Sequence, residues 1–160
     1  DIDDSKSVND EDTANKWEEF VMKQQFEAEI NEFHEVLTRW FSGTLPRTEQ
    51  GFSGLANVLA EDFTLISPRG VSTSSAVDSK IEGAHGVHSA VRFSIRIENC
   101  QLRFASGPHC LGTYEEWQER NGVTTARLST VLFRVRTDRR NGLEWLHLHE
   151  TWLEGYAPAG

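Results

Sequence analysis

The sequence predicts one α+β domain in which a long helix packs against an antiparallel sheet. Three observations support this fold class. Apolar residues repeat with helical spacing over 14–41, they alternate with period two from residue 93 onward, and Asn-Gly pairs at 121–122 and 141–142 separate the last three alternating segments. Because the helical segments come first and the strands follow, we expect the helices on one face of the sheet. A chain of 160 residues is long enough to bury one core.

The first element is a long amphipathic helix. Residues 1–12 are acidic and polar and are expected to form a disordered tail, after which Asp12 or Thr13 can cap the helix. Gly43 and Pro46 end it. Its apolar stripe, which needs a broad apolar surface to cover, consists of Trp17, Phe20, Val21, Phe26, Ile30, Phe33, Leu37, Trp40 and Phe41.

Shorter elements connect this helix to the sheet. Residues 52–60 predict a second helix, and residues 62–70 predict a strand that enters a tight turn at Arg69-Gly70. Residues 71–75 fit a returning strand. Residues 79–93 begin with the capping-box pattern Ser79 to Glu82 but hold two glycines, so they predict a short, imperfect helix.

Four strands follow, at 93–104, 110–120, 123–136 and 143–153. If both Asn-Gly pairs form two-residue loops, counting outward from each turn gives the register. The first turn then pairs Arg127 with Glu116, Ser129 with Tyr114 and Thr130 with Thr113. The second pairs Val135 with Leu148, Phe133 with Glu150, Val131 with Trp152, His147 with Arg136 and His149 with Arg134.

This register predicts two faces. The face toward the long helix carries Leu146, Leu148, Glu150, Trp152, Val135, Phe133, Val131, Ser129, Arg127, Tyr114 and Glu116. The outward face carries Trp145, His147, His149, Thr151, Arg134, Arg136, Leu132, Thr130, Thr113, Glu115 and Trp117. A slip of one residue in the second hairpin would reverse the last strand, and the charged segment 136–144 leaves a longer loop open.

Composition narrows the classes of partner. A formal charge of −9 argues against nucleic acid and anionic membranes, and no apolar run is long enough to span a bilayer. We therefore expect a cytoplasmic protein, with a removed signal peptide left open. Cys100 and Cys110 are expected to be reduced thiols, one bridge being the alternative. No motif indicates a cofactor or a metal site.

The predicted inner face holds the candidate site. Glu150 lies there beside Phe133, Leu148 and Trp152, so burial should raise its pKa and suit it to acid–base catalysis, unless an arginine or a backbone amide pairs with it. Tyr114 is the second candidate for proton transfer.

Other polar groups have a structural alternative. Glu116 and Arg127 can line the polar end of a pocket or form an ordinary cross-strand pair. His147 and His149 have a strand spacing that suits a metal, but the predicted arginine neighbours argue against it. His85 and His88 are expected on the surface.

The order of elements and two segments, "EDFTLISPRG" and the final "HLHETW", resemble the NTF2-like superfamily, and within it the SnoaL-like or DUF4440 type. The last strand "WLHLHE" is also similar to that of the association domain of calcium/calmodulin-dependent protein kinase. The resemblance covers residues 13–155 and leaves 156–160 as a tail. It implies a cone-shaped sheet around the long helix, an internal pocket and dimerisation through the outer sheet face.

The favoured function is binding of a small, partly apolar molecule in that pocket. The expected ligand-binding residues are Tyr114, Glu116, Arg127, Ser129, Phe133, Glu150 and Trp152. One alternative is a cofactor-free isomerase or lyase that uses Glu150 or Tyr114, and another is a structural oligomerisation hub. An enzyme predicts an unpaired carboxylate in a closed pocket, a binding protein predicts pocket groups that are already paired, and a hub predicts a filled interior.

Overall fold

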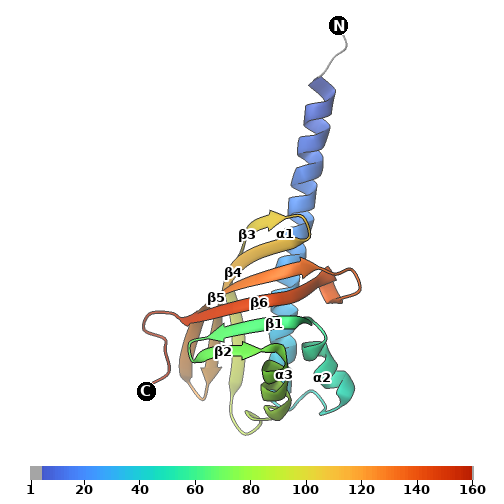
Figure 1. Ribbon diagram of the computed structural model, residues 1–160. Helices are drawn as coiled ribbons and strands as arrows, with labels where there is room; N and C mark the ends of the chain where they lie inside the picture. Colours follow the sequence, from blue (N-terminus) through green and yellow to red (C-terminus); the bar gives the residue numbers. More distant parts are fainter. Residues whose placement is uncertain (1–4, 160) are drawn as a thin grey trace.

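The computed structural model describes residues 5–159. Within them a mostly antiparallel sheet curves beside one long helix, with two short helices at one end (Figure 1). The helices are α1 (Ser5–Phe41), α2 (Glu49–Ala56) and α3 (Ser74–Gly83). The strands are β1 (Leu59–Ser67), β2 (Gly70–Thr73), β3 (Phe93–Ser106), β4 (His109–Arg120), β5 (Val123–Val135) and β6 (Leu143–Trp152). Their order is β2-β1-β6-β5-β4-β3, and β1 runs parallel to β6 while the other neighbours are antiparallel. The predicted α+β fold is confirmed.

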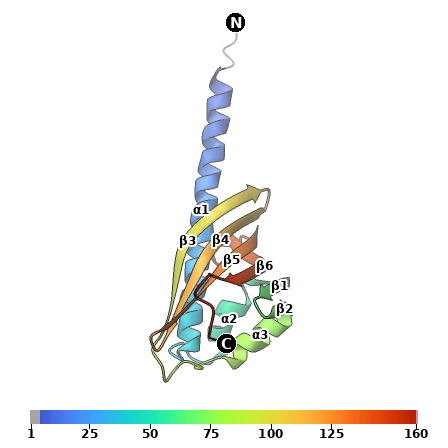
Figure 2. The same ribbon diagram turned by 90° about the vertical axis from the view of Figure 1, so that its left-hand side faces the viewer.

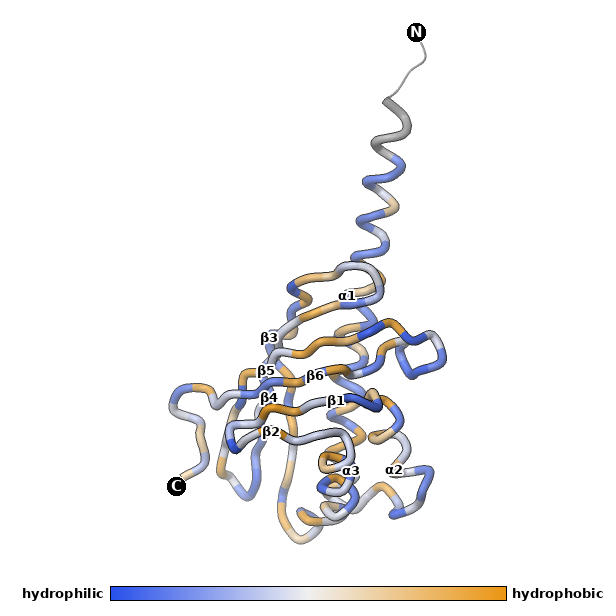
Figure 3. The backbone as a smooth tube through the Cα atoms, viewed as in Figure 1, coloured by the Kyte–Doolittle hydropathy of each residue, from blue (hydrophilic) through white to orange (hydrophobic). Residues whose placement is uncertain are grey.

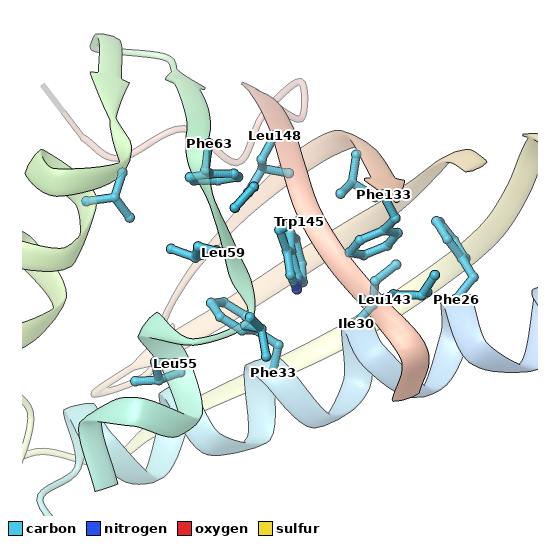
Figure 4. Packing of buried hydrophobic residues seen from close by; sticks show 14 of the residues in the cluster. Phe26, Ile30, Phe33, Leu55, Leu59, Phe63, Phe133, Leu143, Trp145 and Leu148 are labelled. Carbon is cyan, nitrogen blue, oxygen red and sulfur yellow. The ribbon is translucent and has the colours of Figure 1, made fainter. Parts of the chain in front are cut away.

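The second half of α1 packs along the inner face of the sheet. Phe26, Ile30 and Phe33 point from α1 toward the strands, where they meet Phe133 and Trp145 (Figure 4). The rings of Phe26 and Phe133 meet edge to face with centroids 5.6 Å apart, and those of Phe33 and Trp145 lie 4.7 Å apart. Each buried aromatic or aliphatic side chain of this kind contributes roughly 1.5–3 kcal/mol. The core is therefore built on the stripe that the sequence indicates.

A glycine lets α1 approach the sheet closely. A Cβ atom on Gly112 of β4 would lie 2.1 Å from Cζ of Phe26 and 2.5 Å from the carbonyl oxygen of Gln101. No side chain fits there without displacing the ring or the neighbouring strand. Gly112 thus makes room for the first buried aromatic residue of α1.

The first half of α1 differs from the prediction. The helix begins at Ser5, before the expected start at Asp12 or Thr13, so the described part of the expected tail, residues 5–12, is helical; residues 1–4 lie outside the described chain. This half extends past the sheet (Figure 2), and from residue 10 onward it consists mainly of hydrophilic residues (Figure 3). Trp17 and Phe20 are 66% and 49% exposed. The early residues of the apolar stripe therefore do not contribute to the core.

Two short helices begin earlier than their patterns suggest. Helix α2 starts after Thr48, whose side chain accepts a hydrogen bond from the Gly51 amide, and it ends before the strand that begins at Leu59. Helix α3 starts at Ser74, directly after β2, so the predicted Ser79 to Glu82 cap is wrong. The strand β2 ends at Thr73 and α3 begins at the next residue, so no loop separates the two elements.

The first hairpin has the predicted register. Arg127 lies opposite Glu116 and Ser129 opposite Tyr114, and Asn121 has the positive φ that a tight turn requires. Alternation along β4 and β5 then places the same residues inward as expected.

The predicted register of the second hairpin is wrong. Val135 pairs with Leu143 and Phe133 with Trp145, because 136–142 form a longer loop that ends in a 3-10 turn. The reason is a buried carboxylate on α1. Glu29 is fully buried and accepts hydrogen bonds from Arg140 Nη2, Asn141 Nδ2 and Trp145 Nε1, all at 3.0 Å. Binding to Glu29 draws the loop onto the helix and outweighs the local preference of Asn-Gly for a two-residue turn.

The face assignment survives this error except at Trp145 and Leu146. The pairing along most of β6 is shifted by four residues, which preserves parity, so Glu150 lies opposite Ser129 and still points inward. An irregularity in the pairing between Leu132 and Phe133 then shifts the register by one more residue. In the part of β6 next to the loop, inward and outward residues are therefore exchanged. As a result Trp145, predicted outward, is fully buried, and Leu146 is only partly buried. His149 lies opposite Thr130 and His147 opposite Leu132, not opposite arginines.

The structure also describes the cysteines, the acidic and histidine side chains and the helices. Cys100 and Cys110 are both free thiols, and burial raises the pKa of Cys110 to about 11. Among the described residues, no group of His, Cys, Asp and Glu side chains is arranged to hold a metal ion. No described helix has the length and apolar character needed to cross a membrane.

Candidate functional site

A cavity of about 280 Å³ lies between α1, α3 and the inner face of the sheet. Its volume is near the lower end of the range of about 300–1,000 Å³ for ligand pockets. Most of its wall is apolar and comes from α1, β1 and α3. These side chains include Phe33, Leu37, Phe41, Phe63, Leu65 and Ile81.

One part of the wall, which we call the polar floor, consists of His34, Glu116, Gln118, Arg127 and Glu150. His34 comes from α1, and the other four come from adjacent strands β4, β5 and β6. His34, Glu116 and Glu150 are all less than 10% exposed. Buried charges of this kind require partners.

His34 and Glu116 form a buried ion pair. His34 Nδ1 donates to the carbonyl oxygen of Ile30 at 2.7 Å, so Nε2 faces Glu116 Oε1 at 2.8 Å. Burial alone would lower the pKa of His34, but the charge and the hydrogen bond of Glu116 raise it above its ordinary value. Burial alone would raise the pKa of Glu116, but His34 and then Arg127 and Gln118 lower it to about 2. His34 is therefore a cation with both nitrogens in use.

Arg127 joins this pair to Glu150. Its Nη1 donates to Glu150 Oε2 at 2.6 Å, and its Nε lies 3.8 Å from Glu116 Oε2. The guanidinium also lies over the ring of Trp152, 4.9 Å from the ring centroid. Burial raises the pKa of Glu150 and Arg127 lowers it, with a net rise. Glu150 is thus paired with an arginine. This is the structural role that the sequence leaves open for Glu150 beside that of a free catalytic carboxylate.

Tyr114, Ser129 and Phe133 are fully buried and do not line the cavity. The hydroxyl groups of Tyr114 and Ser129 make no hydrogen bond of normal geometry to any described residue. Burial, together with Glu116 and Glu150, raises the pKa of Tyr114 well above its ordinary value. The tyrosine therefore stays protonated behind the polar floor.

The remaining candidates lie outside the cavity. Trp152 lines a neighbouring hollow, which His88 also lines. His85 bonds the carbonyl oxygen of Leu45 at 2.7 Å and packs against Trp40. His147 and His149 lie on the outward face, as predicted.

Two members of the polar floor, His34 and Gln118, were not predicted. A signal for His34 exists in the sequence, since it follows Ile30 by four residues and thus lies within the apolar stripe of the long helix. Gln118 follows Glu116 by two residues on the same inward face. Only the packing of α1 on the sheet brings His34 to Glu116.

A family model described as sucrose-6-phosphate phosphohydrolase C-terminal matches residues 26–154. The chain belongs to this family. Among curated members of similar sequence are sucrose-phosphatase 2 and sucrose-phosphatase 1 of Nicotiana tabacum, 25% and 23% identical over 131 and 132 residues. Each match covers 81% of this chain but 31% of the relative. The chain therefore spans about a third of the length of the curated relatives it matches.

Solved structures confirm the NTF2-like fold for this member of the phosphohydrolase C-terminal family. An NTF-2 like protein of unknown function, PA1314 from Pseudomonas aeruginosa, superposes with a TM-score of 0.71 at 25% identity over 81% of this chain and 98% of that chain. A putative scytalone dehydratase from Novosphingobium aromaticivorans gives 0.67 at 12% identity over 89% and 91%. ActVI-ORFA from Streptomyces coelicolor gives 0.56 at 16% identity over 82% and 97%.

Proposed function

We propose that this chain binds a small, partly apolar molecule in the cavity between α1 and the sheet. The observation that carries the proposal is the pairing of the polar floor inside a wall that, apart from Lys80, is otherwise apolar. Glu116 is engaged by His34, and Glu150 is engaged by Arg127. Binding sites commonly combine an apolar wall with a few fixed polar groups.

The charge of the polar floor indicates what part of a ligand it accepts. The cations His34 and Arg127 balance the anions Glu116 and Glu150, so the floor is neutral as a unit. Burying another charge against it would be costly, whereas a hydroxyl or carbonyl group needs only a hydrogen bond. Glu150 lines the cavity, and its Oε1 accepts no hydrogen bond from any described residue, so it can accept one from a hydroxyl group of the ligand. We infer that the buried part of the ligand is uncharged.

The same contacts disfavour the acid–base enzyme. His34 has no free nitrogen, the pKa of Glu116 is far below neutral, and Tyr114 does not line the cavity. Glu150, whose pKa is raised, is the one floor carboxylate left for proton transfer. The relatives named sucrose-phosphatases suggest a sugar phosphate as a ligand to compare. A disaccharide would leave most of its hydroxyl groups against aromatic and aliphatic side chains, so we favour a smaller and less polar molecule.

The experiment is a calorimetric titration of the protein with three neutral probes, 2-naphthol, 1-octanol and sucrose. We expect saturable binding of the first two and none of sucrose. Leu65→Trp places a bulky indole ring in the cavity wall, and Val71→Trp introduces the same ring at a residue that is 69% exposed and does not line the cavity. The Leu65 variant should bind at least tenfold more weakly, and the Val71 variant should match the wild type. Absence of binding by all probes, or equal binding by both variants, would overturn the proposal.

We also infer a homodimer through the outer face of the sheet, as the NTF2-like resemblance implies. Leu128 lies on that face and is 40% exposed. Light scattering of the wild type and of Leu128→Glu tests this. A monomeric mass for the wild type would exclude the dimer, and a larger assembly would favour a structural hub.

A further inference from the structure

The inner face of the sheet continues past the polar floor to a second hollow of about 550 Å³, which we call the cavity mouth. Gln118 and Arg127 line both spaces, so the mouth adjoins the cavity directly. Along β4, alternation carries the inward face from Glu116 through Gln118 to Arg120 at the end of the strand. Arg69 reaches the same hollow from the turn between β1 and β2.

The cavity mouth is cationic. Arg69, Arg120 and Arg127 line it, and its lining contains no aspartate or glutamate. Arg127 is already held by Glu150. Arg69 and Arg120, by contrast, form no ion pair with any carboxylate among the described residues. In a chain with 25 acidic and 16 basic residues, two such arginines on one hollow mark a local reversal of the overall charge.

His88 supports the same view of the mouth. Its Nδ1 is buried and makes no hydrogen bond to any described residue. Burial and then the positive charge of Arg120 lower the pKa of His88 below its ordinary value. The positive charge of Arg120 therefore reaches His88 within the mouth.

We propose that the cavity mouth binds a carboxylate or phosphate group carried by the same molecule whose apolar part occupies the cavity. This inference rests on the proposed function and adds the chemical class of the ligand, an amphipathic anion. Arginine suits this role because its planar donors match the oxygens of carboxylate and phosphate in pairs. The neutral polar floor and the cationic mouth then recognise two different parts of one ligand.

The test compares matched probes that differ only in the group that reaches the mouth. Each 2-naphthyloxyalkanol, with a spacer of one to three methylene groups, is paired with the alkanoate and the alkyl phosphate of the same spacer. We expect at least one anion of each kind to bind about tenfold more tightly than its alcohol at low salt. The advantage should shrink as sodium chloride is added, since partly exposed charges are screened. Inorganic phosphate at matched ionic strength should compete with the anionic probes and spare the alcohols.

Variants assign the effect to the mouth. Arg69→Gln combined with Arg120→Gln should abolish the advantage of the anions while leaving the affinity for the alcohols unchanged. Arg47→Gln combined with Arg103→Gln removes the same charge from residues that do not line the mouth and should retain the advantage. Circular dichroism checks that each variant is folded.

The outcomes separate the two proposals. Alcohols that bind with no gain for either anion would leave the cavity function standing and overturn the anionic mouth. Persistence of the gain in the Arg69 and Arg120 variant would also overturn it, because the anion would then bind elsewhere. Absence of binding by every alcohol would instead overturn the cavity function itself.

Discussion

Replacing Glu116 by glutamine should destabilise the fold by about 3 kcal/mol at neutral pH. Two arguments, both based on the His34–Glu116 ion pair, give this magnitude. A fall in the pKa of Glu116 from 4.5 to about 2 corresponds to roughly 3 kcal/mol in favour of the charged form, at about 1.4 kcal/mol for each tenfold change. Breaking a buried ion pair by removing one partner costs about 3–5 kcal/mol, because the partner, here His34, is left buried and uncompensated.

The effect should depend on pH in a definite direction. Glu116 is more acidic in the folded state than in the unfolded state, so its stabilisation is complete above pH 4.5 and is lost as the pH falls through about 2. Urea unfolding followed by circular dichroism should show the cost of the substitution shrinking to about 1 kcal/mol at pH 3. Glu119→Gln, at an exposed residue of the same strand, should cost less than about 0.5 kcal/mol. A cost below about 1 kcal/mol at pH 7, or an equal cost at pH 3, would refute the ion pair.

Two further predictions concern the elements that hold the site. Glu29→Gln should cost about 3 kcal/mol in urea unfolding, because it leaves the loop donors without a charged acceptor, while Glu32→Gln, at a side chain that is 46% exposed, should cost less than about 1 kcal/mol; equal costs would exclude Glu29 as the anchor of the loop. Gly112→Ala should cost about 3 kcal/mol in thermal unfolding, since the new methyl group meets Phe26, and Phe26→Leu should recover part of the loss. Gly83→Ala, which meets no atom within 4 Å, is the control and should be neutral.

The sequence predicts the sheet well because local signals agree there. Period-two alternation and a tight Asn-Gly turn both favour the β4–β5 hairpin, and the observed register follows from counting outward. The β5–β6 connection fails because the decisive contact is not local. Glu29 lies more than a hundred residues before Arg140 and Asn141, so no window around the turn can reveal it.

The candidate site is predicted in part for the same reason. Glu116, Arg127 and Glu150 meet because two strand pairings bring them together, and an error of four residues in one pairing does not change which face they occupy. His34 is missed because its role depends on how α1 is rotated against the sheet. A histidine within an apolar helical stripe is more often a satisfied core residue, and here it is both satisfied and part of the cavity wall.

The two buried carboxylate clusters differ in what they reveal about function. Glu29 bonds groups of the loop and of β6 and does not line the cavity, so its role is fully explained by the fold. The polar floor holds no loop in place, yet it keeps charged groups beside an apolar space. Replacing a buried ion pair with apolar residues of similar volume is often neutral or stabilising. Stability therefore gives no reason for these charges to face a cavity, and this supports our proposal that they recognise a polar group on a bound molecule.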